Sequence, residues 1–287
     1  MSASHIAEPA RLAIRGEGGV ALAGEEAGQG AAIVLLHGLT ATRRYVVMGS
    51  RSLQRSGHRV IAYDARGHGS SAPAHERAYG YEHLAADLLA VLDAAGVQRA
   101  LLAGASMGAH TALALALAHP ERVSALALIT PAYDPDAFAA PAELARWDAL
   151  AEGLRDGGVE GFVAAYGLAS LPERWRATAE TALRQRLAAH EHPAAVADAL
   201  EVVPRSRPFA ALAQLRAIAV PVLVVASRDE ADPGHPLAVG ERYARAIPGA
   251  QLLVEPEGPP ARSPIAWQGG QLSRAIAELA ALSAHRG

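Results

Sequence analysis

Short apolar stretches recur along this chain, and each is followed by a stretch with the spacing of an amphipathic helix. Ala31–Leu36, Val60–Tyr63, Ala100–Ala103, Val123–Ile129 and Val220–Ala226 are rich in Val, Ile, Leu and Ala. Continuous apolar runs of this length are typical of strands that are buried on both faces. Strands that alternate with helices indicate a mainly parallel sheet with helices on both sides. The pattern therefore predicts an α/β fold.

Weaker signals complete this framework. Two opening strands, Arg11–Arg15 and Val20–Ala23, flank glycines that suit a hairpin turn. Gln251–Val254 is expected to be the last strand. The 3.6-residue periodicity predicts helices at Tyr45–Ser56, Tyr81–Ala95, Ala109–Ala118, Pro236–Ala246 and Leu272–Leu282.

The middle of the chain breaks the alternation. Pro131–Ala210 contains no convincing strand, and its pattern is helical with several Gly and Pro interruptions. A separate second domain is the weaker interpretation, because the strand pattern resumes soon afterwards. We therefore expect an α/β core formed by residues 1–130 and 211–287, with residues 131–210 inserted as a helical cap.

Charge and cysteine content exclude several classes of protein. The 287 residues carry a formal net charge of −3, which provides no broad basic field for nucleic acid. With 0 cysteines, the chain has no disulfide, thiolate metal site or cysteine nucleophile. Residues Met1–Gly30 lack the apolar core of a secretory signal, and no apolar run is long enough to cross a bilayer. We expect a cytoplasmic protein without membrane or nucleic-acid partners.

The strongest chemical signal is the pentapeptide Gly104-Ala105-Ser106-Met107-Gly108, which lies between a predicted strand and a predicted helix. A strand that turns sharply into a helix strains the backbone of its middle residue and leaves room only for small neighbours. Such a turn presents the serine hydroxyl beside the N-terminus of the helix, where backbone N–H groups favour negative charge. The pentapeptide predicts that Ser106 is a nucleophile.

A second signal follows the strand Ala31–Leu36, where the chain continues as His37-Gly38-Leu39. The glycine allows the chain to turn away, so that the backbone N–H of Leu39 can point toward the serine. An oxyanion hole needs two such donors, and the residue after the nucleophile, Met107, supplies the other. We predict that Leu39 and Met107 form the oxyanion hole and that His37 has a structural role.

A carboxylate is expected near the carboxyl end of a late strand, because ligands bind at that edge of such sheets. The strand Val220–Ala226 is followed by three acidic residues. Asp229 is the preferred candidate, Asp232 is its competitor, and Glu230 is a poorer third.

In this order the motifs resemble the α/β-hydrolase superfamily. The resemblance rests on the Ser106 turn, the His37-Gly38 turn, the Asp64–Gly69 loop and the Asp229–Pro233 loop, and it covers nearly the whole chain from Gly30 onward. The most similar members are small esterases, lactonases and cofactor-free haloperoxidase-like proteins with a helical cap. The resemblance implies the α/β-hydrolase fold, a small-molecule substrate and no cofactor. It leaves the substrate open, because this fold hosts many chemistries.

One element of that family's pattern is missing. The family places its catalytic histidine just after the last strand, in the chain order Ser, Asp, His. Here that position falls on Pro259 or Pro260, and no histidine occurs between His235 and His285. Since general base catalysis contributes roughly 10²–10⁴-fold, the absence of this base decides whether the chain is an efficient enzyme.

Four histidines remain as substitutes for the base. His235 lies in the acidic loop, His110 lies one helical turn beyond the serine, His285 lies near the C-terminus, and His37 lies close to the serine but is expected to point away from it. Each also has a simpler structural interpretation, so the sequence leaves the base open.

The leading functional prediction is a serine hydrolase that acts on a small carboxylic ester, thioester or lactone. The alternative is a non-catalytic protein that binds a small molecule on the same fold, and a lyase or isomerase is a third option. The histidines lack the spacing of metal ligands, so no metal site is predicted. No phosphate-binding glycine loop followed by Lys and Ser/Thr is present either.

Overall fold

The computed structural model describes residues 8–228, 232–256 and 263–284, and its strands form one eight-stranded sheet. The order across the sheet is β1-β2-β4-β3-β5-β6-β7-β8. The strands are β1 (Ala10–Arg15), β2 (Ala21–Ala27), β3 (Ala32–Leu36), β4 (Arg59–Tyr63), β5 (Ala100–Ala105), β6 (Val123–Ile129), β7 (Val222–Val225) and β8 (Gln251–Leu253).

The sheet is mainly parallel, as predicted. β1 pairs with β2, and β2 with β4, in antiparallel fashion. Every pairing from β4 through to β8 is parallel. The carboxyl ends of these six strands therefore lie along one edge of the sheet, and the loops that follow them meet there.

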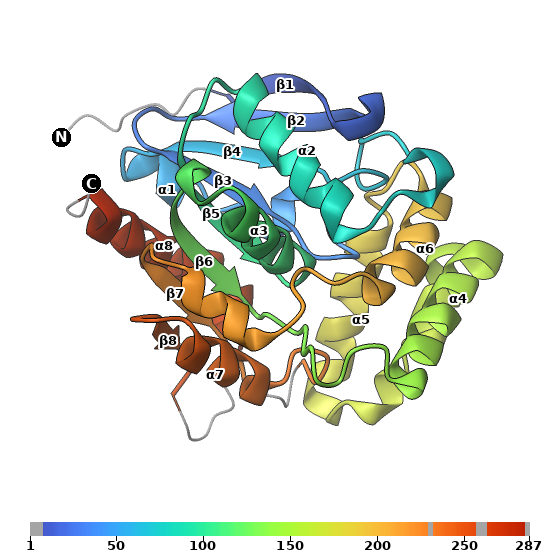
Figure 1. Cartoon of the computed structure of the whole chain (residues 1–287). Coiled ribbons are helices and arrows are strands. Elements are labelled where there is room, and N and C mark those ends of the chain that lie inside the picture. The colour runs from blue at the N-terminus through green and yellow to red at the C-terminus, as the bar shows by residue number, and fades with distance from the viewer. Residues whose placement is uncertain (1–7, 229–231, 257–262, 285–287) are drawn as a thin grey trace.

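Helices cover both faces of the sheet (Figure 1). One buried cluster joins it to Leu88 of α2, Leu113 of α3 and Tyr243 of α7. A second cluster on the opposite face contains Leu53 of α1 and Ile276 of α8. The helices are α1 (Ser52–Arg55), α2 (Tyr81–Ala94), α3 (Met107–Ala118), α4 (Pro141–Ala165), α5 (Glu173–Leu187), α6 (Pro193–Val202), α7 (Leu237–Ala246) and α8 (Gly269–Ala284).

Helices α4, α5 and α6 lie together on the side toward which the arrowheads of β3 and β6 point (Figure 1). Gly158 interrupts α4 with a φ of 58°, close to the break that the glycines predicted. Leu150, Phe162 and Val196 of α4 and α6 share a third buried cluster with Leu39 and Met107. The segment between β6 and β7 therefore packs against the loop that follows β3 and the start of α3.

The predicted helix Tyr45–Ser56 is wrong. The structure has a 3₁₀ turn at Arg43–Tyr45 and only a short helix, α1, at Ser52–Arg55. Met48 and Gly49, with φ angles of 49° and 71°, adopt a left-handed backbone that no α-helix accommodates. The apolar pattern of this segment reflects packing, because Val46 and Val47 are buried in the same cluster as α8.

Candidate active site

Ser106 lies in a strained turn between β5 and α3. Its φ and ψ angles are 49° and −112°, a combination that a non-glycine residue adopts only when the surrounding structure enforces it. A Cβ atom on Gly104 would lie 2.3 Å from the backbone of Gly108, and one on Gly108 would lie 2.3 Å from the carbonyl oxygen of Leu36. Both positions therefore require glycine, so that β3, β5 and α3 can approach closely enough to form the turn.

Backbone hydrogen bonds hold this turn on both sides. The Ser106 N–H donates to the Ile129 carbonyl at 2.9 Å, and its own carbonyl accepts from Ala109 and His110. Within the described part of the chain, the Ser106 hydroxyl has no hydrogen-bond partner, and the residue is partly exposed. The hydroxyl is therefore free to meet a molecule from outside.

The turn after β3 lies beside the serine, because a Cβ on Gly38 would lie 3.5 Å from the Ser106 Cβ. The carbonyl of Gly38 accepts from His37 Nδ1 at 2.8 Å and from the Ala41 N–H at 3.0 Å. Since a peptide unit is planar and trans, fixing that carbonyl also fixes the N–H of Leu39 in the opposite direction. The N–H of Met107 opens α3, where no intrahelical acceptor exists.

His37 is held in one neutral form. Its Nε2 accepts the N–H of Ala65 at 2.9 Å, so Nδ1 carries the proton that it donates to the carbonyl of Gly38. Burial lowers the pKa of His37 to about 3, and the electrostatic effect of the neighbouring His68 acts in the same direction. With both nitrogens engaged, His37 supports the turn, as its structural interpretation predicted.

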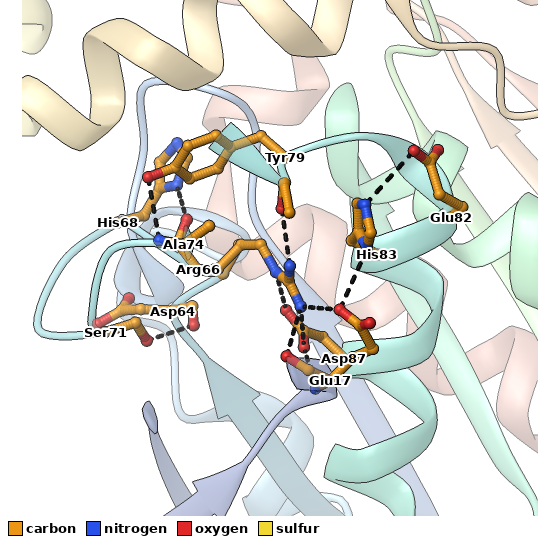
Figure 2. A network of polar contacts seen from close by, with 12 residues as sticks. Glu17, Asp64, Arg66, His68, Ser71, Ala74, Tyr79, Glu82, His83 and Asp87 are labelled. Carbon is orange, nitrogen blue, oxygen red and sulfur yellow. Dashed lines mark hydrogen bonds and ion pairs between the residues drawn. The ribbon is translucent and has the colours of Figure 1, made fainter. Parts of the chain in front are cut away.

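The loop after β4 is organised around Arg66, whose side chain is almost fully buried (Figure 2). Its Nε and Nη2 donate to both carboxylate oxygens of Asp87 at 2.7 and 2.8 Å, and Nη1 donates to the Ala78 carbonyl. Burial alone would lower the pKa of Arg66, but the hydrogen bonds and charge of Asp87 raise it. Arg66 therefore stays charged and ties this loop to α2.

Three histidine rings join the loops after β3 and β4 to the segment between α5 and α6. His68 lies between His37 and His190, with ring centroids 5.2 and 5.5 Å away. Its Nε2 faces the carbonyl of Leu39 at 2.6 Å. His190 accepts the N–H of Gly69 at Nδ1, and its Nε2 donates to the carbonyl of Thr40. His68 thus connects the loop after β4 to the loop after β3 and to the segment between α5 and α6.

His110 packs behind the serine turn with both nitrogens engaged. Its Nε2 accepts the N–H groups of Ala132 and Tyr133 at 3.2 and 3.1 Å, so Nδ1 donates to the Tyr81 hydroxyl at 3.0 Å. Burial lowers its pKa to about 3, and the charge of His235 acts in the same direction. As a candidate base, His110 therefore has no nitrogen left for Ser106.

The acidic loop after β7 brings two of the predicted candidates together. His235 Nδ1 lies 2.8 Å from Asp232 Oδ2, and the His235 N–H donates to the Asp232 carbonyl at 3.1 Å. Burial would raise the pKa of Asp232, but the charge and hydrogen bond of His235, with the charges of Arg186 and Arg146, lower it below its usual range. Asp229 and Glu230 lie outside the described residues.

The end of β8 carries a buried carboxylate. Glu255 accepts the N–H of Arg228 at 2.6 Å through Oε1, whereas its Oε2 is buried without a hydrogen-bond partner in the described structure. The hydroxyl of Ser227, at the end of β7, is also buried and unpartnered there. Pro259, Pro260 and His285 lie outside the described residues, so the missing histidine after β8 stays a prediction.

Comparisons with known proteins identify the framework. Residues 31–260 match the family model described as the alpha/beta hydrolase fold. The chain belongs to the α/β-hydrolase fold family. This result confirms the resemblance and the fold class that the motifs predicted.

Relatives within this family have several hydrolytic activities by name. RutD of Variovorax paradoxus, a protein named as a carbamate hydrolase, is 33% identical over 242 residues, or 82% of this chain and 86% of RutD. A thermophilic esterase from Thermogutta terrifontis superposes with a TM-score of 0.75 at 27% identity, covering 96% of this chain and 99% of the esterase. Est816, described as an N-acyl homoserine lactone degrading enzyme, gives a TM-score of 0.68 at 26% identity, over 95% and 98%.

The structure adds two features of this α/β-hydrolase that the sequence analysis missed. One is the Arg66–Asp87 ion pair, whose partners are separated by 21 residues. The other is the contact of His190 with the loops after β3 and β4. Asp87 is a charged residue within the apolar pattern of α2, but neither this signal nor the residues around Arg66 and His190 reveal the partners.

Two further findings concern ligands and membranes. Among the described residues, no group of three or more His, Asp or Glu side chains is arranged to hold a metal ion. In the same part of the chain, no helix combines the length and the apolar composition that crossing a membrane requires.

Proposed function

We propose that this α/β-hydrolase is a serine hydrolase of small carboxylic esters, thioesters or lactones, with Ser106 as its nucleophile. The observation that carries the proposal is the left-handed backbone of Ser106 between β5 and α3, enforced by two glycines. A strained residue persists only where its surroundings over-determine it, and such residues cluster at active sites. The free hydroxyl at this turn supports a role in chemistry.

In the proposed reaction, Ser106 Oγ attacks the carbonyl carbon of the substrate. The N–H groups of Leu39 and Met107 stabilise the oxyanion, and hydrogen bonds to the Gly38 carbonyl support the orientation of Leu39. The alcohol or thiol then leaves, and water releases the acyl group from Ser106. Asp229 stays a prediction as the carboxylate that orients the base.

We further propose that residues 131–210 form a cap over this site. The buried cluster that joins α4 and α6 to Leu39 and Met107 supports this assignment. A cap of this kind would exclude water and limit the size of the substrate. A small-molecule partner and a cytoplasmic location stay predictions.

The names of the relatives favour acyl compounds as first substrates. A carbamate, a short-chain ester and a lactone each present a carbonyl carbon to the same nucleophile, so one oxyanion hole serves all three. The alternative is a binding protein that holds such compounds without cleaving them, and the absence of histidine between His235 and His285 favours it.

The test compares the wild type with Ser106→Ala on p-nitrophenyl acetate and butyrate, a lactone and a small carbamate. The same proteins are treated with a fluorophosphonate, which labels only an activated serine. Ser124→Ala is the matched control, because Ser124 is also partly exposed but lies near the amino end of β6.

We expect turnover and labelling in the wild type and the control, with both lost in Ser106→Ala. Losing a triad member typically leaves about 10³–10⁴-fold acceleration over water, so a small residual rate in that variant is consistent. If the wild type neither turns over nor reacts with the probe, the serine hydrolase proposal is wrong.

A further inference from the structure

His235 differs from the buried histidines in how its ring is engaged. His37, His110 and His190 each use one nitrogen as an acceptor and the other as a donor within the protein. His235 has a carboxylate at Nδ1, and in the described structure its Nε2 has no hydrogen-bond partner. A histidine whose Nδ1–H is fixed by a carboxylate presents Nε2 as a free acceptor, which is the form that a general base needs.

Local hydrogen bonds fix the positions of Asp232 and His235 relative to one another. Asp232 and His235 are joined by a backbone hydrogen bond as well as by their side chains, so the turn itself holds the ring against the carboxylate. Their side chains are 18% and 24% exposed. His235 lies two residues before Leu237, the first residue of α7. The ring is therefore neither a frayed surface group nor a fully enclosed one.

This turn lies on the same edge of the sheet as the serine. The end of β5 is bonded to the end of β6 through Ser106 and Ile129, and β6 is bonded to β7 through Thr130 and Val225. Two strand spacings, about 10 Å in all, separate the strand ends. Ser106 and His235 both follow strands that end at this edge, and β6 with the loop that follows it lies between those strands.

The C-terminal half of α7 contacts that intervening loop. Tyr243 donates from its hydroxyl to the Tyr133 carbonyl at 2.7 Å, and Arg242 forms ion pairs with Asp134 and Asp136. Tyr133 is also one of the two residues whose N–H groups bind His110, one helical turn beyond Ser106. The segment after β6 thus connects the serine turn to the C-terminal half of α7.

We propose that His235, oriented by Asp232, is the general base that activates Ser106. This inference rests on the proposed serine hydrolase function and moves the base from the loop after β8 to the loop after β7. In the first step, the Ser106 hydroxyl proton passes to His235 Nε2 while Oγ bonds to the carbonyl carbon. The proton then passes to the leaving oxygen as the carbon–oxygen bond of the substrate breaks. Water repeats the same transfers to release the acid.

Charged groups from several elements face this pair. The charges of Arg146 of α4 and Arg186 of α5 lower the pKa of Asp232, and the neutral ring of His110 of α3 is also close enough to interact with His235. These two guanidinium groups help to keep Asp232 ionised, so that it accepts the Nδ1–H of His235 and stabilises the imidazolium that forms during catalysis. The pair thus supplies an ionised carboxylate and an imidazole ring that this carboxylate holds.

The test measures kcat, KM and the rate of fluorophosphonate labelling for His235→Ala, His235→Gln and Asp232→Asn in the full-length protein. His119→Ala is the matched control, because His119 also faces a carboxylate, Glu121, but lies at the C-terminal end of α3, away from Ser106. Thermal melting of each variant checks folding, and His235→Gln keeps a polar side chain of similar reach. Added imidazole is tested on His235→Ala.

We expect both His235 variants to lose roughly 10²–10⁴-fold in kcat and in labelling rate with little change in KM. Imidazole should restore part of the rate of His235→Ala, which a purely structural role would not allow. Asp232→Asn should also lower kcat, and His119→Ala should match the wild type.

Two outcomes overturn the proposal in distinguishable ways. If His235→Ala and His235→Gln keep the wild-type rate while Ser106→Ala is inactive, the serine hydrolase stands and its base lies elsewhere. If the wild type is itself inert toward substrates and probe, the proposed function fails together with its base.

Discussion

The loops after β3, β4 and β5 differ from those after β7 and β8 in how their buried polar groups are paired. In the first region, His37, Asp64, Arg66 and His190 all have protein partners. In the second region, two buried side-chain atoms have no partner in the described structure: Ser227 Oγ, just beyond β7, and Glu255 Oε2, just beyond β8.

This difference in hydrogen bonding indicates different roles for the two regions. A paired network rigidifies its surroundings, and in the first region the paired groups lie beside the serine turn, although Gln54 Oε1 of α1 is buried without a partner among the described residues. Buried polar atoms without partners cost free energy and call for an explanation, such as a role in binding or catalysis. We therefore expect the first region to hold the geometry of the serine turn constant and the second to keep hydrogen-bonding groups available.

Acid should affect the first region most strongly. His37, His110 and His190 are buried and neutral, and burial lowers the pKa of each to about 3. Their ordinary value in the unfolded chain is about 6.5, so between these limits the unfolded state binds more protons. Stability is therefore fully present above about pH 6.5 and falls as the pH decreases, by up to ~1.4 kcal/mol per unit for each histidine.

Urea denaturation at several pH values between 7.5 and 5 measures how the unfolding free energy changes with pH. This interval lies above the range where most carboxylates titrate. His190→Gln should reduce the pH dependence of the unfolding free energy by the contribution of one histidine. An unfolding free energy that stays constant over this interval would contradict the neutral, buried state of the three rings.

The next largest effect is expected at the ion pair of the first region. Arg66→Met leaves Asp87 buried without its partner, and breaking a buried pair in this way costs about 3–5 kcal/mol. Arg184→Met is the comparison, because Arg184 pairs with Glu160 and Glu180 on the surface of α5. Urea denaturation should show a large loss for the first variant and almost none for the second; equal midpoints would show that Arg66 does not hold its loop.

A smaller loss of stability is expected when a methyl group is added inside the serine turn. Gly108→Ala places a methyl group against the backbone of Leu36 and should cost about 1–3 kcal/mol, with a parallel loss of labelling at Ser106. Gly270→Ala in α8 meets no atom within 4 Å and should stabilise the helix by about 0.5–1 kcal/mol. Thermal melting distinguishes the two, and a tolerated Gly108→Ala would show that the turn does not need its close contacts.

The sequence predicted one region better than the other for a physical reason. The Ser106 turn depends on glycines next to one another in the chain, and the order of the strands follows from continuous apolar runs. The pairing of Asp232 with His235 is also local, but three acidic residues follow the same strand, and the sequence pattern does not show which of them pairs with a histidine. His190 reaches Gly69 across 121 residues, and no local pattern encodes such a contact. Tyr45–Ser56 was misassigned because burial imposed an apolar pattern without a helix.

The smallest expected effects distinguish two buried serines, one in each region. In the first region, Ser71 donates to the Asp64 carbonyl at 2.6 Å and accepts the Ala23 N–H at 2.9 Å. Ser71→Ala leaves both backbone groups unpaired and should cost about 1–3 kcal/mol. Ser227 in the second region is equally buried, but its hydroxyl has no partner among the described residues, so Ser227→Ala should be neutral or slightly stabilising.

Chemical denaturation of the two variants, measured side by side, decides whether the regions differ in this way. If Ser227→Ala costs as much as Ser71→Ala, the Ser227 hydroxyl is satisfied in solution, and the second region is as fully paired as the first. If Ser227→Ala is neutral for folding but changes KM toward the best substrate, the unpaired hydroxyl belongs to substrate binding. The loops after β7 and β8 would then set specificity on a framework that the loops after β3, β4 and β5 hold in place.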